Sequence, residues 1–175
     1  MNFFSALTDK IFAYLVCVSK SKTEFVLETE PRSIGKISVG RQMVNGKINL
    51  VGQIIRHKDE IWNLKADKKS FLKKIHSFDW VDDLAALGTL EARRFAQNWL
   101  YLWMAKYSAG SGPGWTAELT GMRLVRWTHH YLFLTQGLSE ENLKKFNLLL
   151  ARQANFLSKR YHHFQFSVRL LNLSG

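Results

Sequence analysis

Apolar residues recur in steps of three and four through most of the chain after residue 70. This spacing places them on one face of a helix. The first stripe consists of Phe71, Ile75, Phe78, Val81 and Leu84, and the second of Leu90, Phe95, Trp99, Leu102 and Met104. Gly88 lies between the stripes, and the second ends near Ser108. We therefore expect one helix before Gly88 and another after it.

Two more stripes follow a glycine-rich connection at residues 109–114, which we expect to be flexible. The third stripe consists of Leu119, Met122, Val125, Leu132 and Leu134, and the fourth of Leu143, Phe146, Leu150, Ala154 and Leu157. Thr116 and Ser139 precede them as predicted N-caps. Gly137 ends the third helix, and Lys159 and Arg160 lie in the last turn of the fourth. Short connections between such helices predict antiparallel hairpins.

Residues 23–64 have a different sequence pattern, in which short apolar stretches alternate with turn residues. The stretches 25–27, 37–39 and 48–51 resemble short strands. Asn45-Gly46 predicts a hairpin turn, because both residues tolerate positive φ. The chain thus divides into an amphipathic N-terminal helix (1–22), a strand and turn segment (23–64) and a helical domain (65–175).

The apolar run at residues 11–18 is shorter than the roughly 20 residues that a membrane-spanning helix needs. Lys10 before it and the serines at 19 and 21 match a signal peptide only loosely. The pattern favours a packed or interfacial helix. The compartment, bacterial periplasm or cytoplasm, stays open.

The formal net charge of +11 favours polyanionic partners: nucleic acid, acidic polysaccharide or anionic lipid. A solvated basic surface is the alternative. No nucleic-acid-binding motif is recognised. Cys17 is the single cysteine, which excludes an intramolecular disulfide and a cysteine-based metal site.

Two groups of residues could carry acid–base or metal chemistry. Asp79, Asp82 and Asp83 share one helical face, where a salt-bridged surface with Lys73 and Lys74 is favoured over a catalytic pair. The histidine pairs 129–130 and 162–163 are adjacent and so point about 100° apart on a helix, which does not suit two-ligand metal binding. We therefore predict neither a metal nor another cofactor.

The stretch 112–127 contains the candidate binding residues Trp115, Arg123, Arg126 and Trp127. Arg123 and Trp127 are four apart and lie on one helical face, and Arg126 is three from Arg123. An indole beside guanidinium groups suits an acidic sugar, because the ring stacks on the sugar and the fork holds its carboxylate. The alternative is a cation–π pair that locks one helix on another. Both interpretations remain open.

Several pieces in order resemble the heparinase II/III family of polysaccharide lyases across residues 33–160. They are Gly40-Arg41, the segment 45–52, Ile61-Trp62, the block His76-Ser77-Phe78-Asp79-Trp80-Val81-Asp82-Asp83-Leu84, Trp99 with Trp103, and Gly114-Trp115-Thr116 with Arg123 and Trp127. The resemblance implies a mainly α fold: a partial α/α toroid of antiparallel helix hairpins with a short N-terminal β segment. In full members a β-sandwich follows, and acidic polysaccharides are cleaved by β-elimination.

The family's catalytic Asn, His and Tyr residues lie later in the toroid and in the β domain. This chain has no Asn-His pair, so no catalytic residue is carried over from the family. The resemblance implies the N-terminal helical portion of a lyase, inactive alone and truncated or frameshifted, whose partners are acidic polysaccharide and the missing β-sandwich.

Two other functions remain as alternatives. The first is a basic helical module that binds polyanions without catalysis. The second, membrane association through residues 3–18 and the lysines at 65, 68, 69, 73 and 74, is disfavoured.

Overall fold

The computed structural model describes residues 3–18, 35–55, 61–63 and 69–173 and confirms a mainly helical chain with a small sheet. The helices are α1 (Phe3–Val18), α2 (Ile37–Val44), α3 (Lys69–His76), α4 (Trp80–Leu87), α5 (Leu90–Tyr107), α6 (Ala117–His129), α7 (Tyr131–Thr135) and α8 (Glu140–Leu173). The strands β1 (Ile48–Leu50) and β2 (Gln53–Ile55) form an antiparallel pair. The predicted strand at 25–27 lies outside the described residues.

The predicted strand at 37–39 is wrong, because these residues open helix α2. Gly40 lets this helix pack closely against α4, because an added Cβ would be 2.2 Å from the carbonyl oxygen of Asp83. A side chain at this position would push the two helices apart. Burial of Met43 on the same face adds apolar contact, so tertiary packing decides the local structure.

The hairpin predicted around Asn45-Gly46 is wrong, and the antiparallel pair forms later in the chain, between β1 and β2. That dipeptide ends α2: Gly46 has φ +78°, its N–H donates to the carbonyl of Met43, and the N–H of Lys47 donates to that of Gln42. This is the bonding of a Schellman cap. The hairpin turn falls instead at Val51 and Gly52, both with positive φ. Gly46 takes the positive φ that the sequence indicated, but Asn45 has φ −75°, and the dipeptide ends a helix.

The helix predicted from Phe71 to Leu84 is divided into α3 and α4 by a turn at residues 77–79. Phe78 in this turn has φ +62°, which is rare for a bulky residue and costs of order 1–3 kcal/mol. Its side chain is fully buried, with its ring centroid 4.8 Å from that of Trp80 and 5.0 Å from that of Trp127. Burial of the ring among these indoles offsets the strain.

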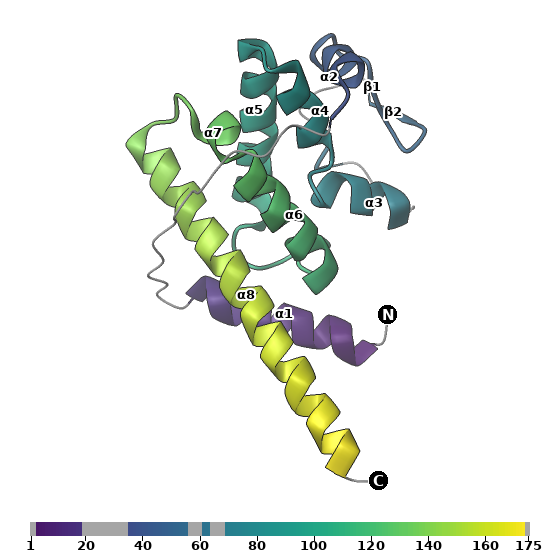
Figure 1. Cartoon of the computed structure of the whole chain (residues 1–175), viewed down its shortest axis with the longest axis vertical. Coiled ribbons are helices and arrows are strands. Elements are labelled where there is room, and N and C mark those ends of the chain that lie inside the picture. Colours follow the sequence, from purple (N-terminus) through teal and green to yellow (C-terminus); the bar gives the residue numbers. More distant parts are fainter. Residues whose placement is uncertain (1–2, 19–34, 56–60, 64–68, 174–175) are drawn as a thin grey trace.

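The third predicted helix is also divided, because the backbone leaves helical geometry at His130 between α6 and α7. The predicted caps are confirmed: the side-chain oxygen of Thr116 accepts from the N–H of Leu119, and that of Ser139 from the N–H of Asn142. The fourth helix continues past its predicted last turn at Arg160 to Leu173, and its C-terminal part extends beyond the other helices (Figure 1).

Residues from all three sequence segments contribute to one core. Helix α1 packs against α8 (Figure 1), where Arg160 bonds Asp9 at 2.5 Å. Ala13 and Val16 of α1 join the same buried cluster as Met43 of α2 and the tryptophans of the later helices. None of the described helices is both long and apolar enough to cross a bilayer.

The glycine-rich connection at 109–114 is held by close contacts and is not the flexible link expected from its composition. An added Cβ would lie 2.5 Å from the carbonyl oxygen of Ala13 at Gly110 and 2.5 Å from the ring of Tyr107 at Gly112. The glycines here permit close packing between α1 and the end of α5.

Candidate functional site

The residues predicted to bind substrate are brought together, but three of the four face the core. Arg123 and Trp127 are fully buried, and Trp115 is 2% exposed. The guanidinium carbon of Arg123 lies 4.4 Å from the ring centroid of Trp103, 5.6 Å from that of Trp127 and 5.9 Å from that of Trp115. This is the arrangement of the packing alternative, a buried cation between indole faces. A direct contact with substrate stays a prediction.

Neutral acceptors bind the buried guanidinium of Arg123. Its Nε donates to Oε1 of Gln153 at 2.7 Å, and Nη1 donates to the carbonyls of His76 at 3.0 Å and Gly114 at 3.1 Å. Its Nη2 donates to Oγ1 of Thr120 at 3.3 Å. None of these bonds ends on a carboxylate. Burial lowers the pKa of Arg123 to about 9, so the group is still charged at neutral pH. Through these hydrogen bonds, Arg123 links α6 to α8, to the end of α3 and to the loop before α6.

His76 lies beside this arginine and is kept neutral by its surroundings. Its Nδ1 accepts from the indole N–H of Trp103 at 3.1 Å, which leaves Nε2 to carry the ring proton. Burial, with the charges of Arg123 and Lys106, lowers the pKa of His76 from 6.5 to about 3. A buried, neutral imidazole of this kind is an element of packing and not an accessible base.

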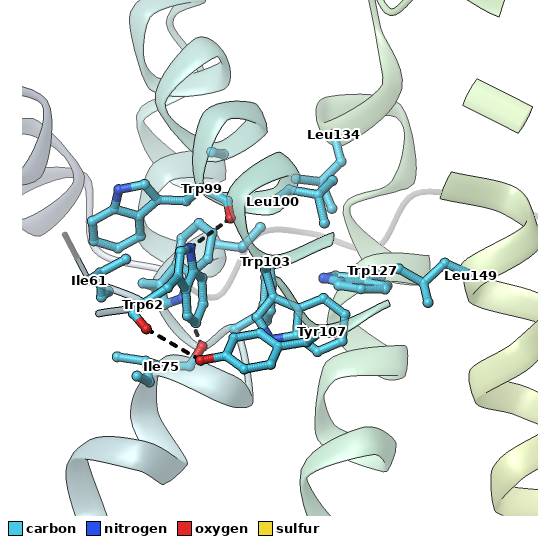
Figure 2. Packing of buried hydrophobic residues seen from close by; sticks show 14 of the residues in the cluster. Ile61, Trp62, Ile75, Trp99, Leu100, Trp103, Tyr107, Trp127, Leu134 and Leu149 are labelled. Atoms are coloured by element: carbon cyan, nitrogen blue, oxygen red, sulfur yellow. Dashed lines mark hydrogen bonds between the residues drawn. The ribbon is translucent and has the colours of Figure 1, made fainter. Parts of the chain in front are cut away.

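Three indole N–H groups of this core donate to backbone carbonyls, whereas that of Trp103 donates to His76 and that of Trp127 has no partner among the described residues. Trp62 donates to Trp99 at 3.0 Å, Trp80 to Ile75 at 3.1 Å and Trp115 to Tyr107 at 2.7 Å. Figure 2 shows the bond from Trp62 to the backbone of α5, with Trp99 near it, and Trp127 on the other side of Trp103. Trp80 meets Trp99, and Trp103 meets Trp127, edge to face, an arrangement that aromatic pairs prefer.

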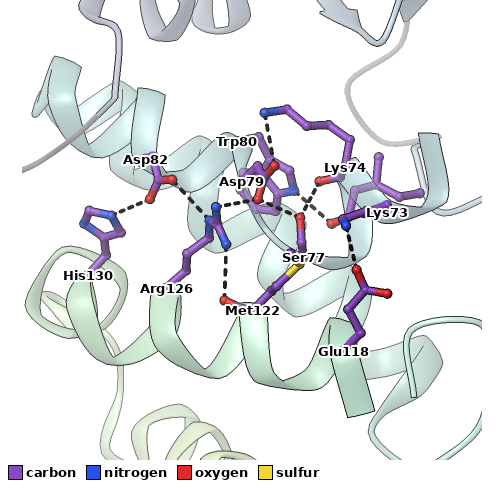
Figure 3. Close-up of polar contacts among 11 residues, drawn as sticks. Lys73, Lys74, Ser77, Asp79, Trp80, Asp82, Glu118, Met122, Arg126 and His130 are labelled. Atoms are coloured by element: carbon purple, nitrogen blue, oxygen red, sulfur yellow. Dashed lines mark hydrogen bonds and ion pairs between the residues drawn. The ribbon is translucent and has the colours of Figure 1, made fainter. Parts of the chain in front are cut away.

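Arg126, the fourth predicted residue, belongs to a polar cluster between α4 and α6 (Figure 3). Its Nη2 lies 2.6 Å from Oδ1 of Asp79, and its Nε lies 3.1 Å from Oδ2 of Asp82. His130 Nε2 is 2.9 Å from the other oxygen of Asp82, and Lys74 Nζ is 3.4 Å from Asp79. The pairing of the aspartates with a nearby lysine, predicted from the sequence, is thus confirmed for Lys74.

The surroundings of Asp82 favour its ionised form. Burial would raise the pKa of Asp82, but hydrogen bonds and charge from His130 and Arg126 hold it below its usual value. Asp83 is engaged elsewhere and accepts from the backbone N–H of Lys36 at 2.7 Å, which ties the start of α2 to α4. The trio therefore joins helices, and its paired oxygens are poorly placed for proton transfer to a substrate.

Among the described residues, no three His, Cys, Asp or Glu side chains gather at a point where they could hold a metal ion. The adjacent histidines at 129 and 130 separate as expected, since His130 is buried against Asp82 and His129 is exposed. The pair at 162–163 lies where side chains are not described.

Sequence reasoning missed a second group of cations, on α8. Lys145 and Arg152 line an open cavity between α5 and α8 together with Tyr101 and Asn142. The signal was present: 145 and 152 are seven apart, two turns of one helical face. Their relation to Tyr101, more than forty residues earlier, could not be predicted without the packing of the two helices.

Comparisons with known proteins give no match: no family model, no curated protein and no solved structure is similar to this chain.

Proposed function

We propose that this chain is the helical portion of a polysaccharide lyase of the heparinase II/III type, which binds acidic polysaccharide and does not cleave it alone. The observation that supports the proposal is where the family-like residues lie. These residues come from four separate blocks of the sequence, and all are buried in one cluster: Trp62, His76 with Phe78, Trp103 and Arg123. Blocks that resemble a family in order and also share a core behave as parts of one scaffold.

The partial toroid belongs to the same proposal. Helices α4 and α5 pack together, as do α6 and α8, and α4 and α5 are joined by the short connection at Gly88 and Thr89. Stacked helix pairs of this kind are the units from which an α/α toroid is built. The arrangement of further pairs around a common axis is the part that an experimental structure would test.

The proposal of inactivity is supported by the state of the titratable groups. His76 is buried and neutral, while Asp82 and His130 are paired with one another. β-Elimination needs a base that reaches the carbon beside the uronic carboxyl, within hydrogen-bond distance of the proton that it removes. Neither histidine is placed to do this.

The net charge of +11 supports a polyanionic partner. The test uses the purified chain with alginate, heparin, hyaluronan and polygalacturonate, and with dextran as an uncharged control. Titration calorimetry should detect binding to at least one acidic polymer and none to dextran. Ultraviolet absorbance should show no unsaturated product. Turnover would contradict the inactivity, and equal or absent binding to all five polymers would contradict the function.

The second candidate is a polyanion-binding module unrelated to lyases, and the same basic charge favours it. Binding to duplex DNA would then weaken steeply with salt, because each neutralised phosphate releases a counterion. Tighter binding to DNA than to every acidic polysaccharide at the same ionic strength would favour this candidate.

A further inference from the structure

An open cavity of about 410 Å³ lies between α5 and α8. We call it the α5–α8 groove; its lining is Tyr101, Met104, Ala105, Ser108, Asn142, Lys145, Leu148, Leu149 and Arg152. Its volume falls within the usual range of ligand sites. The groove is separate from the buried indole rings around Arg123 and from the polar cluster at Asp82.

The polar residues form one row along each helix. Tyr101 on α5 and Ser108 at its C-cap are seven residues apart, and on α8 Lys145 follows Asn142 by three residues and Arg152 follows Lys145 by seven. At 1.5 Å per residue, the row on α8 is roughly 15 Å long. The groove therefore suits an extended chain better than a single small ion.

The charge of the groove is positive, since no residue of its lining is acidic. Lys145 pairs with Glu141 one turn earlier at 2.6 Å, but both side chains are exposed, and such pairs are weak. The Nε of Arg152 is buried and has no hydrogen-bond partner among the described residues. Cys17 lies near Arg152 without neutralising it, because burial raises the pKa of its thiol.

A buried guanidinium nitrogen without a partner is costly, and it is the feature that points to a ligand. A carboxylate in the groove would supply acceptors that fit the planar guanidinium fork after a small side-chain rotation. At the other end the side chains of Tyr101 and Asn142 hydrogen-bond to each other, and their remaining donor and acceptor positions offer hydrogen bonds to hydroxyl groups. The apolar wall from Met104 and Leu149 suits the carbon face of a sugar ring.

We propose that the α5–α8 groove binds a carboxylate-bearing sugar of an acidic polysaccharide, with Arg152 as the carboxylate anchor. Lys145 adds a second positive charge, and Tyr101 with Asn142 binds the hydroxyl groups of a neighbouring sugar. This site rests on the proposed function, because it assumes an acidic polysaccharide as the partner.

The test is titration calorimetry with tetramers of mannuronate, galacturonate and glucuronate. The tightest tetramer is then compared with the same tetramer after its carboxyl groups are reduced to alcohols. Arg152→Gln should weaken binding of the acidic tetramer roughly ten- to a hundred-fold, the effect of losing one charge-assisted contact. The reduced tetramer should bind poorly to both proteins.

Lys145→Gln and Lys144→Gln form a matched pair. Each removes one positive charge and one exposed pair with a glutamate, Glu141 or Glu140, four residues earlier. Only Lys145 lines the groove. Lys145→Gln should weaken binding several-fold, whereas Lys144→Gln should leave it nearly unchanged. Both positions are exposed, so these variants keep the test valid even if Arg152→Gln does not fold.

Three results would overturn the assignment in distinguishable ways. If no tetramer binds the wild-type chain, both the groove assignment and the proposed function are wrong. If a tetramer binds but Lys145→Gln and Lys144→Gln weaken it equally, the function stands and the groove is wrong. If a single-stranded oligonucleotide binds more tightly than every tetramer and depends on Arg152, the groove serves a nucleic acid and not a sugar.

Discussion

His76 should make the chain less stable in mild acid. Its folded pKa of about 3 lies below the usual 6.5, so between these values the unfolded chain binds more protons than the folded chain. The stabilisation is therefore complete above about pH 6.5 and is lost as the pH falls towards 3. At about pH 5 the loss is 1.5 pH units at 1.36 kcal/mol each, or about 2 kcal/mol.

The physical cost lies in the contacts of the ring. Protonation of Nδ1 would break the bond from the Trp103 indole at 3.1 Å and place a second charge beside Arg123. The measurement is urea unfolding followed by far-ultraviolet circular dichroism at about pH 7.5 and about pH 5. The wild-type chain should lose about 2 kcal/mol between them through this residue.

His76→Asn removes the titrating ring and keeps an acceptor for Trp103. This variant should be less stable than the wild type at about pH 7.5, but its stability should depend much less on pH between the two conditions. His129→Asn is the control, because His129 is exposed at the end of α6 and its loss should leave the acid effect intact. An equal acid loss in His76→Asn and the wild type would refute the reasoning.

Three further substitutions, one of them with a matched control, are tested by urea unfolding. Gly40→Ala should destabilise the chain by about 1–3 kcal/mol, because its Cβ would overlap the carbonyl of Asp83. The control Gly121→Ala should be neutral or stabilising, because its Cβ would meet only Leu157, at 4.0 Å; equal effects would contradict the close approach of α2 to α4. Thr116→Ala should cost about 1 kcal/mol through loss of the N-cap of α6, and no loss would show that the cap is not used. Arg123→Met should cost about 3 kcal/mol, since the acceptors around the guanidinium would be left unsatisfied; a stable variant would mean that water or apolar packing replaces it.

The sequence predicts the helices better than the surfaces that they expose. The spacing of Arg123 and Trp127 places both on one face of α6, and they do lie together. The same spacing cannot say whether that face looks inward, because the answer depends on Trp103 and Gln153, which lie twenty and thirty residues away. Burial is a property of the assembled helices, and periodicity describes one helix at a time.

The breaks in the helices also depend on contacts between helices, which the sequence pattern does not show. The apolar stripe through Phe78 continues without interruption, so the pattern predicts one helix. The chain leaves helical geometry there because a buried ring contacts Trp62, Trp80 and Trp127, which no local signal reports. At Asn45-Gly46 the local signal was correct about the φ of Gly46 and wrong about that of Asn45, because the same dipeptide occurs in hairpin turns and at helix ends.

All six tryptophans lie in one buried cluster, in which neighbouring indole centroids are 5.0 Å apart for Trp80 and Trp99 and 5.5 Å apart for Trp103 and Trp127. Excitation absorbed by one ring can therefore pass to the next before emission. The fluorescence of the six tryptophans then acts as one averaged signal. Tryptophan emission would monitor the core of the molecule. It would change little if α1, which contains no tryptophan, detached from the other helices. Comparing the emission with the dichroism signal would reveal whether that helix leaves first.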